Sequence, residues 1–260
     1  MSGPPTRTTD LGRLAQRAAG ALAEGLEACL DAVFVPRCLG CERSGSHFCA
    51  RCVATLQPLP PPWCVRCGRP LAPVESNRGP APRCPDCRRR PLPLEGVRSV
   101  AALDGPLRRA VHRLKYRGRP GGARVLADLL LPLAAGMAGA PPGDGPPLVL
   151  PVPLFPARER ARGYNQAALL ARPLAGRLGL ACRTDLLRRR RETAPQVGLS
   201  REQRRQNVRG AFVAGPEVAG RTVLLVDDVT TTGSTLGSAA GACLAAGASG
   251  VRAVTLAREW

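Results

Sequence analysis

The fold of this chain is decided by the stretch Val223-Leu-Leu-Val-Asp-Asp-Val-Thr-Thr-Thr-Gly-Ser-Thr235. Its apolar half predicts a buried strand over 222–226, because a short apolar run is typical of a strand that is covered on both faces. Two carboxylates, Asp227 and Asp228, follow at the carboxyl end of that strand, and a loop of hydroxyls and glycine then opens a helix predicted over 235–246. The stretch therefore predicts a strand–loop–helix unit with acidic and hydroxyl groups at one end.

This loop has the chemistry that a phosphorylated sugar requires. N–H groups at the N-terminus of a helix bind phosphate, and a glycine lets the backbone approach closely. Asp227 and Asp228 can accept hydrogen bonds from two neighbouring ribose hydroxyls. An ordinary strand-to-helix turn with an N-cap accounts for one aspartate and one threonine, but not for the whole run. The candidate phosphate-binding residues are Thr230, Thr231, Thr232, Gly233, Ser234 and Thr235.

The remainder of the C-terminal part alternates between strand and helix patterns. Strands are predicted over 97–103, 148–153 and 251–256, and helices over 106–116, 122–137 and 165–178. Strands that are apolar along their length and separated by helices imply a parallel sheet with helices on both faces. Such sheets bind their ligands at the carboxyl ends of the strands. The predicted fold class is therefore α/β.

Eight of the eleven cysteines form four C-x-x-C pairs, which is metal-ligand spacing in a reducing compartment. Two pairs supply four thiolates to one tetrahedral zinc ion and leave no position for a substrate, so the expected role is structural. Consecutive pairing would give two zinc ribbons and crossed pairing an interleaved module, and the sequence is compatible with both. The candidate ligands are Cys38, Cys41, Cys49, Cys52, Cys64, Cys67, Cys84 and Cys87. The isolated Cys29, Cys182 and Cys243 are expected to be buried apolar residues.

The chain divides into three parts. Residues 1–35 carry leucines at helical spacing and predict an amphipathic helix over 10–33. Residues 36–95 are rich in cysteine and proline and predict a small module ordered by metal, and residues 96–260 form the α/β domain. No stretch resembles a membrane span or a secretory signal, so a cytoplasmic protein is expected.

The charge of the chain favours polyanionic partners. The net charge is +19, and Lys115 is the one lysine among 38 basic residues. A strongly basic balance fits nucleic acid as well as a phosphorylated small molecule. A single lysine in a chain that otherwise uses arginine indicates that a compact ammonium group is required at that position.

A second candidate anion site follows the strand predicted over 148–153. Arg158 and Arg162 come after this strand and therefore lie at the same end of the sheet as the aspartates, with a solvated basic loop as the alternative interpretation. Asn165 and Gln166 begin the next helix and are expected to orient this loop or contact the ligand. Helix capping accounts for Asn165 almost as well.

The segment around Asp227 resembles the PRPP-binding motif of type I phosphoribosyltransferases, and nearly the full chain resembles the ComF family, whose members are linked to DNA uptake in natural competence. The resemblance rests on the paired C-x-x-C ribbons, Lys115-Tyr-Arg-Gly118, Pro151-Val-Pro-Leu154, Arg162-Gly-Tyr-Asn-Gln166, Pro195-Gln196 and Arg205-x-Asn-Val-x-Gly-Ala-Phe212. One departure is Thr230, where relatives usually carry an aliphatic or aromatic residue.

The resemblance implies a type I phosphoribosyltransferase fold preceded by a zinc-ribbon module. It further implies a Mg²⁺-dependent enzyme that binds PRPP, with Asp227, Asp228, Lys115 and Arg162 in catalytic roles and pyrophosphate near Arg158. The arginine-rich residues 184–212 are expected to include a mobile loop that closes over the ligand. A different class of function is a DNA-uptake protein that binds single-stranded DNA or recruits a helicase, with the sugar-phosphate site as a sensor.

Overall fold

The structure of the protein is a computed structural model that describes residues 35–73, 81–116, 120–139, 144–192 and 200–259. The amphipathic helix predicted over 10–33 and the isolated Cys29 lie outside these residues. No helix among the described residues has the length and apolar character needed to cross a bilayer.

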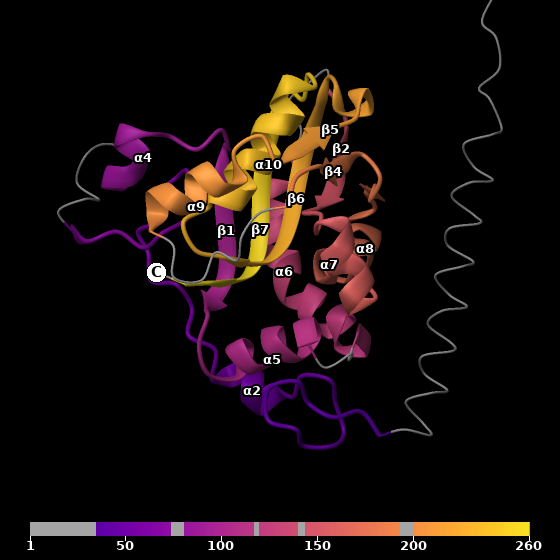
Figure 1. The fold of residues 1–260 in the computed structure, drawn as a ribbon. Helices are drawn as coiled ribbons and strands as arrows, with labels where there is room; N and C mark the ends of the chain where they lie inside the picture. Colours follow the sequence, from indigo (N-terminus) through magenta and orange to yellow (C-terminus); the bar gives the residue numbers. More distant parts are fainter. Residues whose placement is uncertain (1–34, 74–80, 117–119, 140–143, 193–199, 260) are drawn as a thin grey trace, which may run out of the picture.

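The described residues form a parallel five-stranded sheet, as the sequence predicts (Figure 1). The strand order is β1-β7-β6-β2-β3, with β1 at Gly96–Ala102, β2 at Gly145–Pro151, β3 at Ala181–Cys182, β6 at Arg221–Thr230 and β7 at Gly250–Arg258. The strand that carries the aspartates, β6, is central and is longer than predicted. It extends to Thr230 because its last residues continue to pair with β7, where Thr230 lies opposite Arg258.

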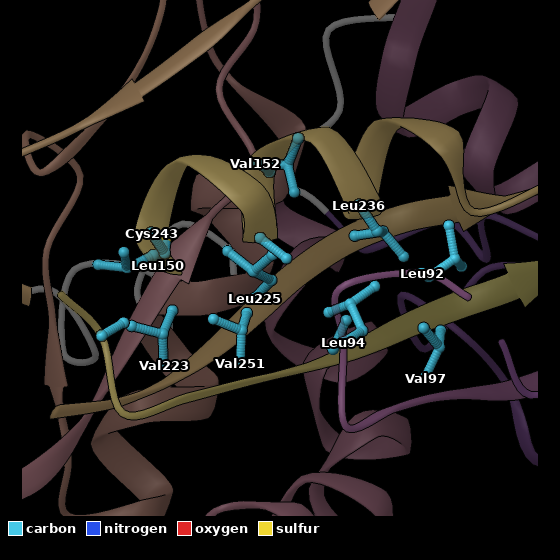
Figure 2. Packing of buried hydrophobic residues seen from close by; sticks show 14 of the residues in the cluster. Leu92, Leu94, Val97, Leu150, Val152, Val223, Leu225, Leu236, Cys243 and Val251 are labelled. Atoms are coloured by element: carbon cyan, nitrogen blue, oxygen red, sulfur yellow. The ribbon is translucent and has the colours of Figure 1, made fainter. Parts of the chain in front are cut away.

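Helices cover both faces of the sheet (Figure 1). Residues of α5 (Gly105–Tyr116), α6 (Ala123–Met137) and α8 (Gln166–Leu178) pack with Leu224 and Val226 of β6 in one buried cluster. The opposite face, with Val223 and Leu225, is covered by α10 (Ser234–Ala245). Figure 2 shows Leu236 and Cys243 of α10 directed onto this face. Alternate residues of β6 therefore face different cores, as its position in the middle of the sheet requires.

Several elements were not predicted from the sequence. A short helix, α7 (Pro156–Arg162), occupies the loop after β2 and ends at Gly163, whose φ of +84° is the left-handed conformation common at helix ends. The arginine-rich stretch contains an antiparallel pair, β4 (Leu187–Arg189) and β5 (Phe212–Ala214), and α9 (Arg201–Val208). The proposed mobile loop falls partly on residues 193–199, outside the described residues.

The cysteine-rich part is packed into the α/β domain. Short helices α2 (Ala50–Ala54) and α4 (Pro85–Arg89) follow a cysteine of each half. Cys38 and Cys52 belong to the buried cluster on the α5 face, and the cysteines between 64 and 87 belong to the cluster on the α10 face. The linker between the halves also covers the outer edge of β1, where the Ala102 N–H donates to the Gln57 carbonyl at 2.9 Å. The two parts of the chain therefore share their hydrophobic cores, although residues 36–95 were expected to be ordered by metal alone.

Of the isolated cysteines among the described residues, Cys243 is buried as predicted, whereas Cys182 is only partly buried. Cys243 is completely buried, and burial raises the pKa of its thiol to about 12. Cys182 on β3 is partly buried and packs against the core on the opposite face of the sheet.

Candidate functional site

The loop after β6 has the form of an anion site. Its hydroxyls interact with one another, since Thr232 Oγ1 lies 2.7 Å from Ser234 Oγ and accepts from the Ser234 N–H at 3.3 Å. Gly233 is the N-cap of α10, so no side chain at that position caps the helix. The first N–H groups of a helix lack partners within the helix, and an anion satisfies them.

Gly233 is required there for two reasons. Its φ is +77°, a conformation that side chains rarely adopt. A Cβ at this position would also lie 2.8 Å from Cδ1 of Leu92, a residue of the linker from the cysteine-rich part. The conformation of the loop therefore depends on its packing against Leu92 as well as on its own sequence.

The two aspartates differ in their surroundings although they are adjacent. Asp228 is 3% exposed and its Oδ2 lies 2.7 Å from Nζ of Lys115 on α5. Asp227 Oδ1 accepts the N–H of Asp228 at 2.8 Å. Burial, and then the neighbouring Asp228 carboxylate, raise the pKa of Asp227 well above its ordinary value. The pair therefore combines one carboxylate held by a cation with one that resists ionisation.

Lys115 is held in place from two sides. The Tyr164 hydroxyl donates to the carbonyl of Leu114 at 2.6 Å, which fixes the last turn of α5 against the segment before α8. Burial by itself would lower the pKa of Lys115, but the Asp228 carboxylate outweighs burial and raises it above its ordinary value. The single lysine, for which the sequence predicted a special role, thus has Asp228 as its partner. The sequence predicted no role for Tyr164.

Asn165 and Gln166 have structural partners. The Asn165 side chain accepts from the Ala167 N–H at 2.9 Å as the N-cap of α8, and it donates to the Val152 carbonyl at 3.0 Å. The first contact is the helix cap, and the second ties Asn165 to the loop after β2, so the side chain both caps α8 and orients that loop. Gln166 accepts a hydrogen bond from the Arg162 guanidinium, which also lies over the Tyr116 ring, 5.2 Å from its centroid.

Arg189 of β4 is a further cation whose charge interacts with that of Asp227. Arg189 of β4 lies over Phe212 at 5.5 Å from the ring centroid. Burial, followed by the charge of Arg158 on α7, lowers the pKa of Arg189, and Asp227 works in the opposite direction. The charges of Arg158, Arg189 and Asp227 therefore influence one another. Sequence reasoning chose Arg158 but took Arg189 only as one member of an arginine run.

Thr230 differs from the other hydroxyl residues of the predicted loop. It is the last residue of β6 and is 3% exposed, whereas Thr231 and Thr232 are partly exposed. Its Oγ1 is buried without a hydrogen-bond partner among the described residues. Its place in the strand separates it from the loop after β6, which begins at Thr231.

The eight predicted ligands form two clusters of four in the consecutive arrangement. In each cluster the sulfur atoms all lie within 4.8 Å of one another. The first cluster consists of Cys38, Cys41, Cys49 and Cys52, and the second of Cys64, Cys67, Cys84 and Cys87. The crossed pairing that the sequence left open is therefore excluded.

The geometry of both clusters fits zinc. A tetrahedral ion with Zn–S bonds of about 2.3 Å places its sulfurs about 3.8 Å apart. Cys38 and Cys52 are 3.6 Å apart at sulfur, Cys41 and Cys49 are 3.7 Å apart, and Cys67 and Cys84 are 3.7 Å apart. Backbone N–H groups of Gly40 and Cys49 also donate to the Cys38 sulfur at 3.3 and 3.4 Å. Two structural zinc sites follow from this donor set.

Comparison with known proteins identifies both parts of the chain. A double zinc ribbon domain matches residues 29–88 and a phosphoribosyl transferase domain matches residues 164–259. The DNA utilization protein YhgH of Salmonella typhi is 37% identical over 213 residues, covering 81% of this chain and 88% of that protein. Competence protein F of Haemophilus influenzae is 32% identical, covering 77% and 87%. Competence protein ComFC of Bacillus subtilis is 27% identical, covering 81% and 84%.

Proposed function

This chain belongs to the ComF/YhgH family of phosphoribosyltransferase-domain proteins with an N-terminal double zinc ribbon, and on that premise we propose that it binds 5-phosphoribosyl 1-diphosphate (PRPP) with Mg²⁺ and transfers its ribosyl group. The observation that carries the proposal is the arrangement at the end of β6. Asp227 and Asp228, the latter paired with Lys115 at 2.7 Å, come shortly before a hydroxyl-rich loop that leads into α10, whose N-cap is Gly233.

Each part of PRPP has a matching group in this arrangement. The 5-phosphate is taken by the N–H groups and hydroxyls of residues 231–235. The ribose diol donates to the carboxylates of Asp227 and Asp228. The diphosphate faces the cationic side formed by Arg158, Arg189 and Arg162, whose forked donors suit phosphate oxygens. These assignments require no covalent nucleophile from the protein.

The reaction then depends on positioning and charge. As the bond from ribose C1 to the diphosphate breaks, negative charge collects on the departing oxygens, and fixed arginines stabilise it without reorganising. Bound Mg²⁺ would supply further charge neutralisation, and Asp227 and Asp228 are the carboxylates that would hold it. The developing positive charge on the ribose lies near the same carboxylates. The acceptor forms a new bond to ribose C1 as the diphosphate departs, so that the 5-phosphoribosyl group is transferred and pyrophosphate is released.

Titration calorimetry with PRPP and Mg²⁺ tests the proposal. We expect saturable binding to the full-length protein that weakens at least about tenfold in Asp227→Ala/Asp228→Ala, since each lost charge-assisted hydrogen bond is worth about 1.5–3 kcal/mol. Asp185→Ala is the matched control, because Asp185 is an exposed acidic residue paired with Arg183. A wild-type protein that does not bind PRPP, or equal affinity in the double variant, contradicts the proposal.

The names of the relatives support a second role. Proteins called DNA utilization protein and competence protein cover most of this chain, so we propose that it acts in the uptake or use of DNA. The arginines of α7 and of residues 188–191 provide a cationic surface beside the site. Fluorescence anisotropy with single-stranded oligonucleotides, repeated over a salt series, measures direct binding. Arg188→Glu/Arg190→Glu should weaken oligonucleotide binding. An affinity that changes neither with salt concentration nor with these two substitutions would exclude this surface as the DNA-binding site.

A further inference from the structure

Arg258, the last residue of β7, is the largest of the fully buried side chains in the described part of the protein. It is 2% exposed, and one of its terminal nitrogens donates to the carbonyl of Cys67 at 2.6 Å. Its Nε has no hydrogen-bond partner among the described residues. An arginine keeps its charge in a protein, so a cation is enclosed at this point of the core.

The charge of Arg258 needs an anionic partner nearby. No described carboxylate forms an ion pair with it, and its hydrogen bond to the Cys67 carbonyl places the guanidinium against a member of the second four-cysteine cluster. A zinc ion with four thiolates carries two net negative charges and lies in the position to compensate a buried guanidinium. Burying a charge without compensation is costly, so this cation and the loaded second cluster stabilise each other.

The first cluster has a different environment. Arg113 of α5 donates to the carbonyl of Leu39, but its charge is balanced by Glu42, with 3.2 Å between the charged atoms. Cys41 of this cluster is exposed, while all four cysteines of the second cluster are buried. The two sites therefore differ both in access to solvent and in the presence of an uncompensated cation.

We propose that Arg258 is a positioning residue that offsets the negative charge of the zinc-loaded second cluster, and that it couples the retention of this zinc to the order of the phosphate loop. Backbone contacts between the ends of β7 and β6 connect Arg258 to the loop after β6. Arg258 pairs with Thr230 in the β6–β7 ladder, and the Glu259 N–H donates to the Thr230 carbonyl at 3.0 Å. Loss of the second zinc leaves a buried cation without a counter-charge at the strand end from which the loop departs.

Zinc affinity of full-length variants provides the test. In equilibrium competition with a chromophoric chelator, Arg258→Met should lower the affinity of the second site by about 10- to 100-fold, the range typical for residues that support metal ligands. Arg258→Lys keeps the charge and should retain more of the affinity. Arg252→Met is the matched control, because Arg252 also lies on β7 but pairs with Glu95 at 2.6 Å. Cys41→Ser identifies the signal of the first site.

Each part of this proposal has an outcome that would overturn it. Equal affinities of Arg258→Met and Arg252→Met, or of the Met and Lys variants at 258, overturn the role of Arg258 at the metal. Should Arg258→Met not fold, hydrogen exchange of the wild-type protein decides: chelation of the second zinc should accelerate exchange over residues 230–235, and unchanged exchange there overturns the coupling. Neither measurement requires the protein to bind PRPP, so failure of the proposed function leaves this inference intact.

Discussion

Nζ of Lys115 lies 2.7 Å from Oδ2 of Asp228, which joins the last turn of α5 to the carboxyl end of β6. Asp228 is 4% exposed at its side chain and Lys115 is 23% exposed, so the pair is shielded from solvent on the acidic side. Lys115→Met should therefore destabilise the fold, by up to about 3 kcal/mol once partial exposure is allowed for, because it leaves a buried carboxylate without its cation. Urea unfolding measures this loss.

A double-mutant cycle separates the pair from its parts. Lys115→Met/Asp228→Asn removes both charges, and we expect it to be more stable than the sum of the single changes by about 1–3 kcal/mol. Arg177→Met with Asp128→Asn forms a control cycle at an ion pair between α6 and α8 that is more exposed. That pair should couple by less than about 1 kcal/mol. Additive effects of the two substitutions would show that the contact between Lys115 and Asp228 contributes nothing to the free energy of unfolding.

The buried state of Asp227 leads to a prediction about pH. Burial raises the pKa of Asp227 above its ordinary value of 3.8, so the folded protein binds this proton more tightly than the unfolded chain. Stability from this group is therefore lost as pH rises from about 3.8 through the folded pKa. Asp227→Asn should be more stable than wild type at pH 8, and the difference should shrink as pH falls toward 5.

Urea unfolding of both proteins at each pH measures this difference. Zinc release and other titrations affect both proteins alike and cancel in the comparison. Asp227→Asn should at the same time bind PRPP more weakly, since a neutral amide is a poorer acceptor for the ribose hydroxyls. A stability difference that is constant from pH 5 to pH 8 would contradict the raised pKa.

Gly233→Ala tests the shape of the phosphate loop. The substitution forces a side chain into φ +77° and into contact with Leu92 at 2.8 Å. Gly220→Ala is the matched control, with φ +64° and nothing within 4 Å of the added carbon. We expect each to lose about 1–2 kcal/mol from the backbone conformation, and Gly233→Ala to lose more. Leu92→Ala added to Gly233→Ala should recover the excess, and equal losses in the two single variants would refute the packing argument.

The central part of the fold was predictable because it follows from short patterns. The apolar run before Asp227 specified a buried parallel strand, and the helices over 106–116 and 122–137 are found within one or two residues of their predicted ends. The end of β6 was not predictable. Whether a strand stops at Val226 or continues to Thr230 depends on the pairing with β7, and polar residues are compatible with either result.

The sequence named Asp227, Asp228 and Lys115, which the structure brings together, but it did not indicate the contacts between them. The run around Asp227 and the single Lys115 indicated charge and phosphate binding, yet their contact joins residues 113 positions apart in the sequence and depends on how α5 packs. Arg189 and Arg258 were missed for a related reason. In a chain with 38 basic residues, burial and not residue type distinguishes a functional arginine, and local sequence does not report burial.

Arg189 should discriminate between two ligands. Its charge interacts with those of Arg158 and Asp227, and the proposed function assigns it to the diphosphate and assigns the 5-phosphate to residues 231–235. Arg189→Met should therefore weaken PRPP binding by about tenfold or more, the value of one charge-assisted contact, and leave ribose 5-phosphate binding nearly unchanged. Arg188→Met is the control, since Arg188 is adjacent on β4 but exposed. Equal losses for both ligands would mean that Arg189 acts on the 5-phosphate or the ribose, which both ligands share, and would overturn its assignment to the diphosphate.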